Sequence, residues 1–380
     1  MKILHLIFSE QVAGAEKHLL NLLPGLQHEG IDCELICVTP KNNKDKFTDY
    51  CEELNQKGVK TTLLTGNKYN FLQIAKRIAQ YIKANNINVL HSHLFKSDVL
   101  AVLVKKLFVK KIFLVSTKHG YEEKYLSTYP VHKGRIFYNS YYFISKYLSR
   151  NTNAQLAVSR TMSDMYFNLK ITPQRIKYIH HGIELAVSPL HTDKEKFRKS
   201  TAQLIIVGRI EEVKGHKYLF DAMPAVIGAF PAVNLMIIGN GTQEGFLKTY
   251  STRLGIENNI SFLGFQQDPY TYIAHSDVIV LPSMFEAFGL VYIEALALQV
   301  PVVGFDAPAC NEIITNNETG LLVPMYDSNA LAEKIIYLLN NPEERKRLTQ
   351  NGYKEYTDHF TTSRMISETA AWYRSIPEIT

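Results

Sequence analysis

The sequence predicts an α/β protein built from two doubly wound parallel sheets. Short, continuous apolar runs rich in β-branched residues recur along the chain, with helical patterns between them. Strands that are apolar along their whole length are typical of parallel sheets covered on both faces. The length of 380 residues and the hydrophobic content of 46% provide for two cores rather than one.

The apolar runs fall into two series. The first half contains KILHLIF, DCELICVT, VKTTLL, NVLHSH and KIFLVSTKH, and the second contains AQLIIVGR, VNLMIIG, ISFLGF, DVIVLPS, VPVVGFD and TGLLVP. Two such series predict two domains. We expect them at 1–185 and 201–357, with a linker at 186–200 and a C-terminal helical segment at 358–380. The alternative is that the charged, proline-containing linker is a loop inside one large sheet.

The net charge of +6 is unevenly distributed. Residues 1–200 hold 30 lysines and arginines against 16 acidic residues, a net charge of +14, whereas residues 201–380 carry a net charge of −8. The first half therefore favours an anionic membrane face or an acidic acceptor as its partner. Nucleic acid is not a predicted partner, because the lysines are scattered rather than interleaved with aromatic residues in a binding module.

Cysteine usage and hydropathy indicate the cellular location. The four cysteines show neither a CxxC pair nor metal-ligand spacing, so a reducing compartment fits best. The apolar opening MKILHLIF is too short for a signal-peptide core, and no run approaches the ~18 apolar residues of a membrane span. The prediction is a cytoplasmic protein, with the inner face of the membrane as a further candidate location.

Ligands of parallel sheets bind beyond the carboxyl ends of the strands. After the first run, Gly14 precedes a helix expected to begin near Ala15, where a glycine and free N–H groups suit an anion. After KIFLVST comes His119, for which a structural role is the alternative. We interpret His91 and His93 as structural, since neither a carboxylate nor a third histidine stands at ligand spacing.

The second half offers a cation pair after its first run. Arg209 directly follows AQLIIVG, and Lys214 comes five residues later, before an amphipathic helix. A bidentate arginine and a mobile lysine at one sheet edge suit a diphosphate. The segment IIGNGTQEGFL has its glycines in a GxGxxxG pattern that departs from the dinucleotide fingerprint, so no nicotinamide cofactor is predicted. It either borders a nucleotide or only shapes a turn.

Two carboxylates eight residues apart mark the segment PSMFEAFGLVYIEAL. The pattern predicts a helix that starts between 287 and 289, so Glu286 precedes it and Glu294 lies within it. Eight residues of helix rise ~12 Å, about the reach from a hexose to a ribose across a diphosphate. Glu286 then suits sugar hydroxyls and Glu294 ribose hydroxyls. The alternatives are a capping carboxylate and a polar residue on the wet edge of a helix.

Backbone N–H groups at the start of this helix complete the predicted phosphate site. The residues that offer them are Phe288, Gly289 and Leu290.

In this order, these residues resemble the retaining GT-B glycosyltransferases of family 4, whose hallmark is an E-x7-E pair. The resemblance covers nearly the whole chain through AGAEKH, STKHG, LAVSR, HHGIE, VGRIEEVKG, SDVIVLPSMFEAFGLVYIEALA, VPVVGFD and NETGLLVP. It implies two Rossmann-like domains that face a central cleft. It also implies that a last helix, from about Phe360 to Arg374, crosses back onto the first domain, where we expect Trp372 and Tyr373 to anchor it.

The resemblance also implies roles for the site residues. Gly14 lets the first loop close on the donor phosphate, and His119 lies beside the reacting sugar with its carbonyl or ring near C6. Arg209 and Lys214 bind the diphosphate, together with the amides around Gly289 and Leu290, while Glu286 contacts the transferred sugar and Glu294 the ribose. Fixed cations and N–H groups can stabilise the departing diphosphate, so neither a metal nor a cofactor is expected.

The sequence departs from the family pattern at two places. Ala13-Gly14 replaces a Gly-Gly pair in the first loop, and Gln299 stands where a glycine commonly precedes the PVV strand. A residue other than glycine at a helix C-terminus can alter the cap and the shape of the donor site. The identity of the donor is therefore open.

The implied function is retaining transfer of a hexose or N-acetylhexosamine from a nucleoside diphosphate sugar, with UDP preferred, to a hydroxyl of a carbohydrate or lipid-linked acceptor. Polysaccharide or glycolipid biosynthesis is the expected setting. The basic, aromatic segments at 104–111 and 132–150 are candidates for peripheral membrane contact, or else are a solvated face or part of an acceptor cleft. The rival functions are a GT-B nucleotide-sugar epimerase and a non-catalytic sugar-nucleotide-binding partner protein.

Overall fold

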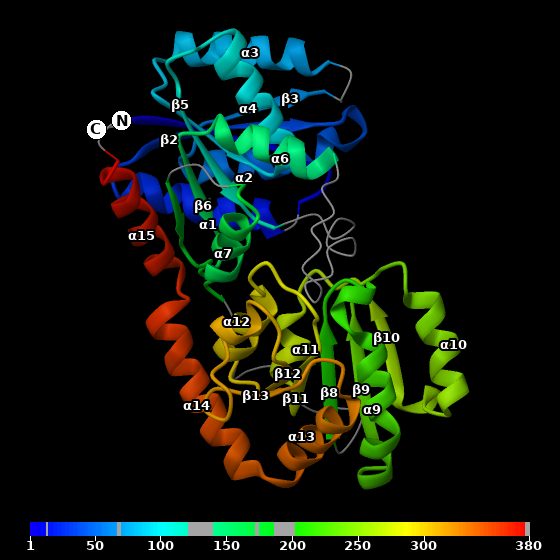
Figure 1. The fold of residues 1–380 in the computed structure, drawn as a ribbon. Helices are drawn as coiled ribbons and strands as arrows, with labels where there is room; N and C mark the ends of the chain where they lie inside the picture. Colours follow the sequence, from blue (N-terminus) through cyan, green and yellow to red (C-terminus); the bar gives the residue numbers. More distant parts are fainter. Residues whose placement is uncertain (13, 67–69, 121–139, 172–174, 186–201, 377–380) are drawn as a thin grey trace. The chain divides into compact units, whose positions relative to one another are not determined.

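The computed structural model describes residues 1–12, 14–66, 70–120, 140–171, 175–185 and 202–376 (Figure 1). The chain divides into two compact units: unit 1 comprises Met1–Gly182 with Thr362–Thr380, and unit 2 comprises Ile183–Thr361. The segment expected as a linker, 186–200, lies outside the described residues. Each unit contains a parallel sheet with helices on its faces, which confirms the prediction of two Rossmann-like α/β domains.

Unit 1 contains a seven-stranded parallel sheet. Its strands are β1 (Lys2–Phe8), β2 (Asp32–Thr39), β3 (Thr61–Thr65), β4 (Val89–His93), β5 (Phe113–Lys118), β6 (Ala154–Ala157) and β7 (Ile176–Tyr178). They are arranged in the order β3-β2-β1-β4-β5-β6-β7. The first five coincide with the predicted apolar runs. The last two were not predicted, because Gln155 in β6 and Lys177 in β7 interrupt what would otherwise be short apolar runs.

Helices cover both faces of this sheet. They are α1 (Gly14–His28), α2 (Lys44–Gln56), α3 (Phe71–Ala84), α4 (Phe95–Leu107), α6 (Ser140–Arg150), α7 (Arg160–Asn168) and α15 (Thr362–Arg374), with a 3₁₀ turn η1 (Lys41–Asn43). Alternate side chains of β1 enter two separate cores, Ile3 and Ile7 beneath α1, α2 and α15, and Leu4 and Leu6 beneath α3 and α4. A strand buried on both faces must be apolar throughout, which is the pattern of KILHLIF.

The C-terminal helix belongs to unit 1, although unit 2 separates it from the rest of that unit in the sequence. Helix α15 returns to unit 1 (Figure 1) and packs against α1. The side chains of Trp372 and Tyr373 are buried in the core beneath these helices. The Arg374 guanidinium donates to the backbone carbonyl of Glu29 just beyond α1. The expected return of the last helix to the first domain is thus confirmed.

Unit 2 contains a six-stranded parallel sheet. Its strands are β8 (Ala202–Val207), β9 (Val233–Ile238), β10 (Ile260–Gly264), β11 (Val278–Leu281), β12 (Val302–Phe305) and β13 (Leu321–Val323), in the order β10-β9-β8-β11-β12-β13. Its helices are α9 (His216–Ala229), α10 (Glu244–Leu254), α11 (Tyr270–Ala274), α12 (Leu290–Ala297), α13 (Ser328–Asn340) and α14 (Pro342–His359), and its 3₁₀ turns are η2 (Glu212–Lys214), η3 (Glu257–Asn259) and η4 (Cys310–Glu312).

In both sheets the strand order reverses beside the first strand. The chain proceeds outward in one direction from β1 to β3 and then resumes on the other side at β4; β8, β10 and β11 repeat this arrangement. The loops that leave the two central strands therefore diverge, and the space between them is where such sheets bind ligands. The predicted site residues follow β1 and β5 in unit 1 and β8 and β11 in unit 2.

In the segment IIGNGTQEGFL, Gly241 has a structural role in the turn after β9. A Cβ on Gly241 would lie 2.2 Å from the carbonyl oxygen of Ile210, whereas a Cβ on Gly245, in α10, would have no neighbour within 4 Å. The backbone of the turn thus packs directly on the loop that follows β8. This close approach accounts for glycine at 241 without a nucleotide.

These two glycines provide a matched test of the packing. We expect Gly241→Ala to lower the free energy of unfolding of unit 2 by about 1–3 kcal/mol, the usual cost of overpacking. Gly245→Ala should instead raise it by about 0.5–1 kcal/mol, because alanine favours the helix. Denaturant unfolding of both variants measures the difference, and equal effects would contradict the assignment.

Candidate functional site

The loop after β8 presents the two cations predicted for unit 2. Arg209 follows the strand at an exposed position, and Lys214 ends the turn η2. Gly215 then adopts the left-handed conformation, with φ of 71°, and a Cβ there would lie 1.9 Å from the carbonyl oxygen of Pro282. Only glycine meets both requirements. The loop after β8 therefore packs directly against the loop after β11.

An ion pair joins the same two loops. The Lys214 ammonium donates to both carboxylate oxygens of Glu286, with N–O distances of 2.7 and 2.8 Å. The two side chains are only 19% and 14% exposed. The backbone N–H of Met284 also donates to the carbonyl oxygen of Val213 at 2.8 Å. A cation and a carboxylate are thus held side by side at the carboxyl edge of the sheet.

Helix α12 begins at Leu290, with Gly289 as its N-cap residue. The predicted start at 287–289 was therefore slightly early. The predicted ~12 Å helical rise between Glu286 and Glu294 is wrong, because only the second half of that stretch is helical. The side chain of Phe288 packs in the core against Phe360, with ring centroids 6.1 Å apart, so it is the backbone of Phe288 that a ligand could contact.

Glu294 lies on α12 beside Tyr270 of α11. Burial, and secondly the negative charges of Glu294 and Asp268, raise the pKa of the Tyr270 phenol to about 12. The Glu294 carboxylate is partly buried. Its surroundings therefore differ from the solvent-exposed helix edge that was the alternative interpretation. A carboxylate next to a protonated phenol can accept hydrogen bonds from hydroxyl groups.

Gln299 follows Leu298, the C-cap residue of α12, at the position where the family commonly has glycine. Its φ of 56° places it in the left-handed region. Residues other than glycine pay a steric cost there. The departure seen in the sequence therefore occurs at a position whose backbone conformation favours glycine.

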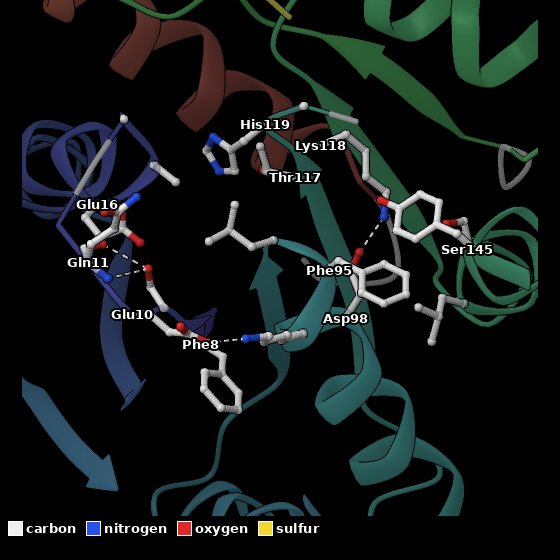
Figure 2. A pocket seen from close by; sticks show the side chains of 18 of the residues that line it. Phe8, Glu10, Gln11, Glu16, Phe95, Asp98, Thr117, Lys118, His119 and Ser145 are labelled. Atoms are coloured by element: carbon white, nitrogen blue, oxygen red, sulfur yellow. Dashed lines mark hydrogen bonds and ion pairs between the residues drawn. The ribbon is translucent and has the colours of Figure 1, made fainter. Parts of the chain in front are cut away.

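Unit 1 contains a cavity of about 800 Å³ at the carboxyl edge of its sheet (Figure 2). Gly14, the first residue of α1, and His119, the first residue after β5, both line it, so the structure brings together the two residues predicted for this domain. Phe95 and Tyr141 supply a stacked aromatic wall, with ring centroids 4.7 Å apart. Polar and aromatic groups on one concave surface are typical of small-molecule sites.

A buried ion pair lies in the wall of this cavity. The Lys118 ammonium contacts Asp98 Oδ2 at 2.5 Å, and the two side chains are 9% and 3% exposed (Figure 2). Asp98 Oδ1 accepts hydrogen bonds from the hydroxyl groups of Ser92 and Ser116, at 2.6 and 2.7 Å. Sequence reasoning missed Asp98, because an aspartate in the first turn of a helix is ordinarily explained by the helix dipole.

His119 belongs to a cluster of buried histidines. Its Nε2 lies 3.0 Å from Nδ1 of His93, whose Nε2 lies 2.9 Å from Nδ1 of His5. The sequence shows no third histidine at ligand spacing from His91 and His93, but the fold provides one. Strand β1 pairs with β4, which places His5 directly beside His91. The missing signal was strand register, which spacing along the chain does not reveal.

Further contacts extend the cluster. His181 Nδ1 lies 2.8 Å from His18 Nδ1, and the ring of His181 is nearly parallel to that of His119, with centroids 5.5 Å apart. His91 Nδ1 is hydrogen-bonded to the Tyr373 hydroxyl of α15. Six histidines thus gather beneath the cavity from five different segments of unit 1.

Burial keeps these imidazoles neutral. It lowers the pKa of His5 to about 3. It also holds the pKa values of the other five well below the ordinary value for histidine; they are His18, His91, His93, His119 and His181. For His119, the positive charges of His181 and Lys118 are secondary causes. At neutral pH the cluster therefore offers N–H donors and lone pairs but no charge.

Three of these histidines have the residue type and proximity of metal ligands. Ring nitrogens of His5, His91 and His93 lie within 4.8 Å of one another. However, the 2.9 Å between His5 and His93 leaves no room in line for a metal ion at about 2.0–2.1 Å from each nitrogen. The geometry is that of hydrogen-bonded imidazoles. The expectation that the reaction needs no metal stays a prediction.

Two family models match adjoining parts of the chain. The model described as Glycosyltransferase Family 4 matches residues 12–187, and the model described as Glycosyl transferases group 1 matches residues 188–355. Together they extend over both units and include every predicted site residue.

The curated relatives share less than a third of their aligned residues with this chain in the two examples that follow. The N-acetyl-alpha-D-glucosaminyl L-malate synthase of Bacillus anthracis is 24% identical over 327 residues, which are 82% of this chain and 83% of that protein. The capsular polysaccharide biosynthesis glycosyltransferase CapM of Staphylococcus aureus is 29% identical over 201 residues, 51% of this chain. The chain spans about half the length of that second relative, 53%.

A solved structure covers the whole fold. The crystal structure of HepE from Anabaena in complex with UDP and glucose superimposes with a TM-score of 0.80 at 20% sequence identity, over 99% of this chain and 100% of that one. A likeness at this level of identity shows that the two proteins share their fold.

The buried histidines predict that acid destabilises unit 1 selectively. In an unfolded chain they titrate near pH 6.5, whereas in the folded unit they stay neutral, so the unfolded state binds more protons below that pH. The free energy of unfolding should therefore fall as the pH falls from about 7 to about 5, by up to about 1.4 kcal/mol per pH unit for each histidine.

Unit 2 provides the internal control. Among the histidines that the structure describes there, one buried residue stands out: burial and then the charge of Lys214 lower the pKa of His216 to about 4. Hydrogen exchange of strand amides in β1 and β4 against β8 and β11, corrected for intrinsic rates, measures the two units separately. Equal loss of protection in both would contradict the neutral cluster.

Proposed function

Because the chain belongs to the glycosyltransferases of family 4 and group 1, and is therefore an enzyme, we propose that it transfers a hexose or N-acetylhexosamine from a UDP-sugar to an acceptor hydroxyl with retention of configuration. The donor, the stereochemistry and the acceptor are the proposed parts. The observation that carries the proposal is the ion pair between Lys214 and Glu286 at the carboxyl edge of the unit 2 sheet.

This ion pair can exchange partners when a donor binds. A diphosphate near η2 would compete with Glu286 for the Lys214 ammonium, and Arg209 lies at the same edge. The Glu286 carboxylate, released from one cation, would then accept hydrogen bonds from sugar hydroxyls. The N-terminus of α12 adds N–H groups for the phosphates. The same groups stabilise negative charge as the diphosphate leaves.

The proposed reaction is a same-face displacement. The bond between the anomeric carbon and the diphosphate oxygen breaks, and a bond between that carbon and the acceptor oxygen forms on the same face of the sugar. The acceptor proton passes to the departing phosphate oxygen, so atoms and charge balance without an oxidant. This route assigns no nucleophile to the protein. Its requirements are positioning and fixed positive charge.

We assign the acceptor to the cavity of unit 1. Its volume of about 800 Å³ and its polar and aromatic lining suit a carbohydrate. His119, in its wall, is the residue that the family resemblance associates with the reacting sugar. The relative from Staphylococcus aureus is named for capsular polysaccharide biosynthesis. A growing lipid-linked or surface polysaccharide is therefore the acceptor class that we propose.

Peripheral membrane contact is supported by exposed apolar side chains on unit 1. They are Leu107 on α4, Phe143, Ile144 and Tyr147 on α6, and Phe167 on α7, between 45% and 68% exposed. Lysines at 106, 110 and 111 and Arg150 are exposed near the ends of the same helices. Residues 132–139 of the second basic segment lie outside the described residues. None of the described helices has the length and apolarity needed to span a bilayer.

The donor site is tested by calorimetric titration with UDP, GDP and ADP without added metal. We expect UDP to bind selectively and Lys214→Ala to weaken it at least about tenfold, because a charge-assisted contact to phosphate is lost. Lys217→Ala is the control, since Lys217 pairs with Asp221 on the exposed side of α9. Absence of binding by all three nucleotides would move the function toward a silent partner protein.

Membrane contact is tested by flotation with vesicles that contain anionic lipid. The double variant Phe143→Ser with Tyr147→Ser should weaken binding about tenfold or more, because each aromatic side chain loses apolar burial. Phe246→Ser with Phe265→Ser removes two aromatics that are similarly exposed on unit 2 and should leave binding unchanged. Equal loss in both variants, or no binding by the wild type, would overturn this contact.

A further inference from the structure

Three histidines of the cluster form one hydrogen-bonded chain from the sheet interior to the cavity. His5 on β1 contacts His93 on β4, and His93 contacts His119 after β5, with nitrogen separations of 2.9 and 3.0 Å. The ring centroids are 5.2 and 5.3 Å apart. Each centroid distance is close to the nitrogen–nitrogen distance plus the distance from centre to nitrogen in each of the two rings. The two nitrogens of a pair therefore lie on the line that joins the ring centres and point at each other, as in a hydrogen bond.

The ends of this chain have no hydrogen-bond partner. Within the described residues, the imidazoles of His5, His93 and His119 form hydrogen bonds only to one another. The two terminal nitrogens, Nε2 of His5 and Nδ1 of His119, are buried and have no partner there. A neutral imidazole has one donor and one acceptor nitrogen. Both internal bonds can therefore form in only two proton arrangements.

The two arrangements differ in what His119 offers. In the first, Nδ1–H of His5 donates to His93 and Nδ1–H of His93 donates to His119, which leaves His119 protonated at Nδ1. In the second, every proton lies on the opposite nitrogen, so His119 has a bare lone pair at Nδ1 and His5 has an unbonded N–H at Nε2. Either way one buried N–H lacks an acceptor, which is an unfavourable condition.

The positions of His5 and His119 in the fold favour the first of the two proton arrangements. His5 lies in the middle of β1, is fully buried, and has strands on both sides. A ligand cannot reach an N–H there. His119 lines the cavity (Figure 2), so of the two buried terminal nitrogens its Nδ1 is the one that borders a space a ligand oxygen can enter. The first arrangement places the unbonded N–H at the end that a substrate can satisfy, and bare buried acceptors are tolerated better than bare buried donors.

We propose that His93 is a positioning residue that holds His119 as its Nδ1–H tautomer, so that His119 donates a hydrogen bond from Nδ1 to an oxygen of the bound sugar instead of removing a proton. The identity of that oxygen rests on the proposed glycosyl transfer, but the tautomer does not. His93 also fixes the ring plane, because its own ring is stacked on His91 with centroids 4.4 Å apart.

Other contacts support this assignment. His91 is in turn hydrogen-bonded to Tyr373 of α15 and, at 2.7 Å, to the hydroxyl of Thr117. The stack beneath His93 is thus fixed at both nitrogens of His91. The ring of His181, 15° from parallel with that of His119, restricts the same imidazole from its other side. The lowered pKa of His119 is consistent with a neutral donor.

The test is ¹⁵N NMR of the full-length protein labelled at histidine, with the His119 signals identified by their loss in His119→Gln. Two-bond and three-bond couplings to ring protons report which nitrogen carries the proton. We expect His119 to be protonated at Nδ1 in the ligand-free wild type. In His93→Phe, which keeps an aromatic ring but removes the donor, the Nε2–H tautomer should become appreciable.

His91→Phe is the matched control. It makes the same substitution two residues earlier on the same strand, at equal burial, and leaves the chain from His5 to His119 intact. It should destabilise the unit while His119 stays protonated at Nδ1. In His93→Gln the amide N–H can still donate to His119 Nε2, so the wild-type tautomer should be largely retained.

Kinetics provide the second measurement. With an active UDP-sugar, kcat of His93→Phe should fall about 10- to 100-fold, the usual effect of losing a partner that orients a functional histidine, with little change in the donor KM. His93→Gln should recover much of this loss. If no sugar donor is turned over, the proposed function fails, but the tautomer remains measurable.

Two results would overturn the proposal. One is a wild-type His119 protonated at Nε2, which is decisive even if His93→Phe does not fold. The other is a folded His93→Phe protein whose His119 tautomer is the same as in the wild type.

Discussion

The reversal of strand order beside the first strand of each sheet is the constraint on which both candidate sites depend. Parallel strands bring their carboxyl ends to one edge, and the reversal separates the loops that leave neighbouring strands there. In unit 2 Gly215 lets the loops after β8 and β11 touch, and Lys214 and Glu286 pair across the contact. In unit 1 the same topology opens the cavity lined by Gly14 and His119.

The two units satisfy their buried polar groups in different ways. Unit 2 uses opposite charges, which can change partners when an anion arrives. Unit 1 uses neutral imidazoles together with one buried ion pair, Lys118 with Asp98, whose carboxylate is also bonded to two serines. Neutral groups can be buried in numbers without the cost of desolvating charge. The two candidate sites thus have different electrostatics on similar sheets.

Much of this architecture could be predicted from the sequence because apolar runs encode strands directly. Of the thirteen strands in the part of the chain that the structure describes, the runs predicted eleven. The family motifs marked Lys214, Glu286 and His119 as candidate site residues. The histidine cluster could not be predicted, because His5, His18 and His181 come from separate segments and meet only through strand pairing and helix packing. The helix start at Leu290 was missed because a glycine N-cap and an apolar turn resemble helix in sequence.

The return of α15 to unit 1 has a consequence for biosynthesis. Because the ribosome synthesises a chain from the N- to the C-terminus, residues 1–182 emerge before α15, the helix that completes their core. Until Trp372 and Tyr373 appear, α1 lacks its neighbour and His91 lacks its phenolic partner. Unit 2, continuous in sequence, can mature first. Unit 1 is thus completed by a segment that is made after unit 2, so a nascent chain cut short before α15 lacks the helix that packs on α1 and the phenol that is bonded to His91.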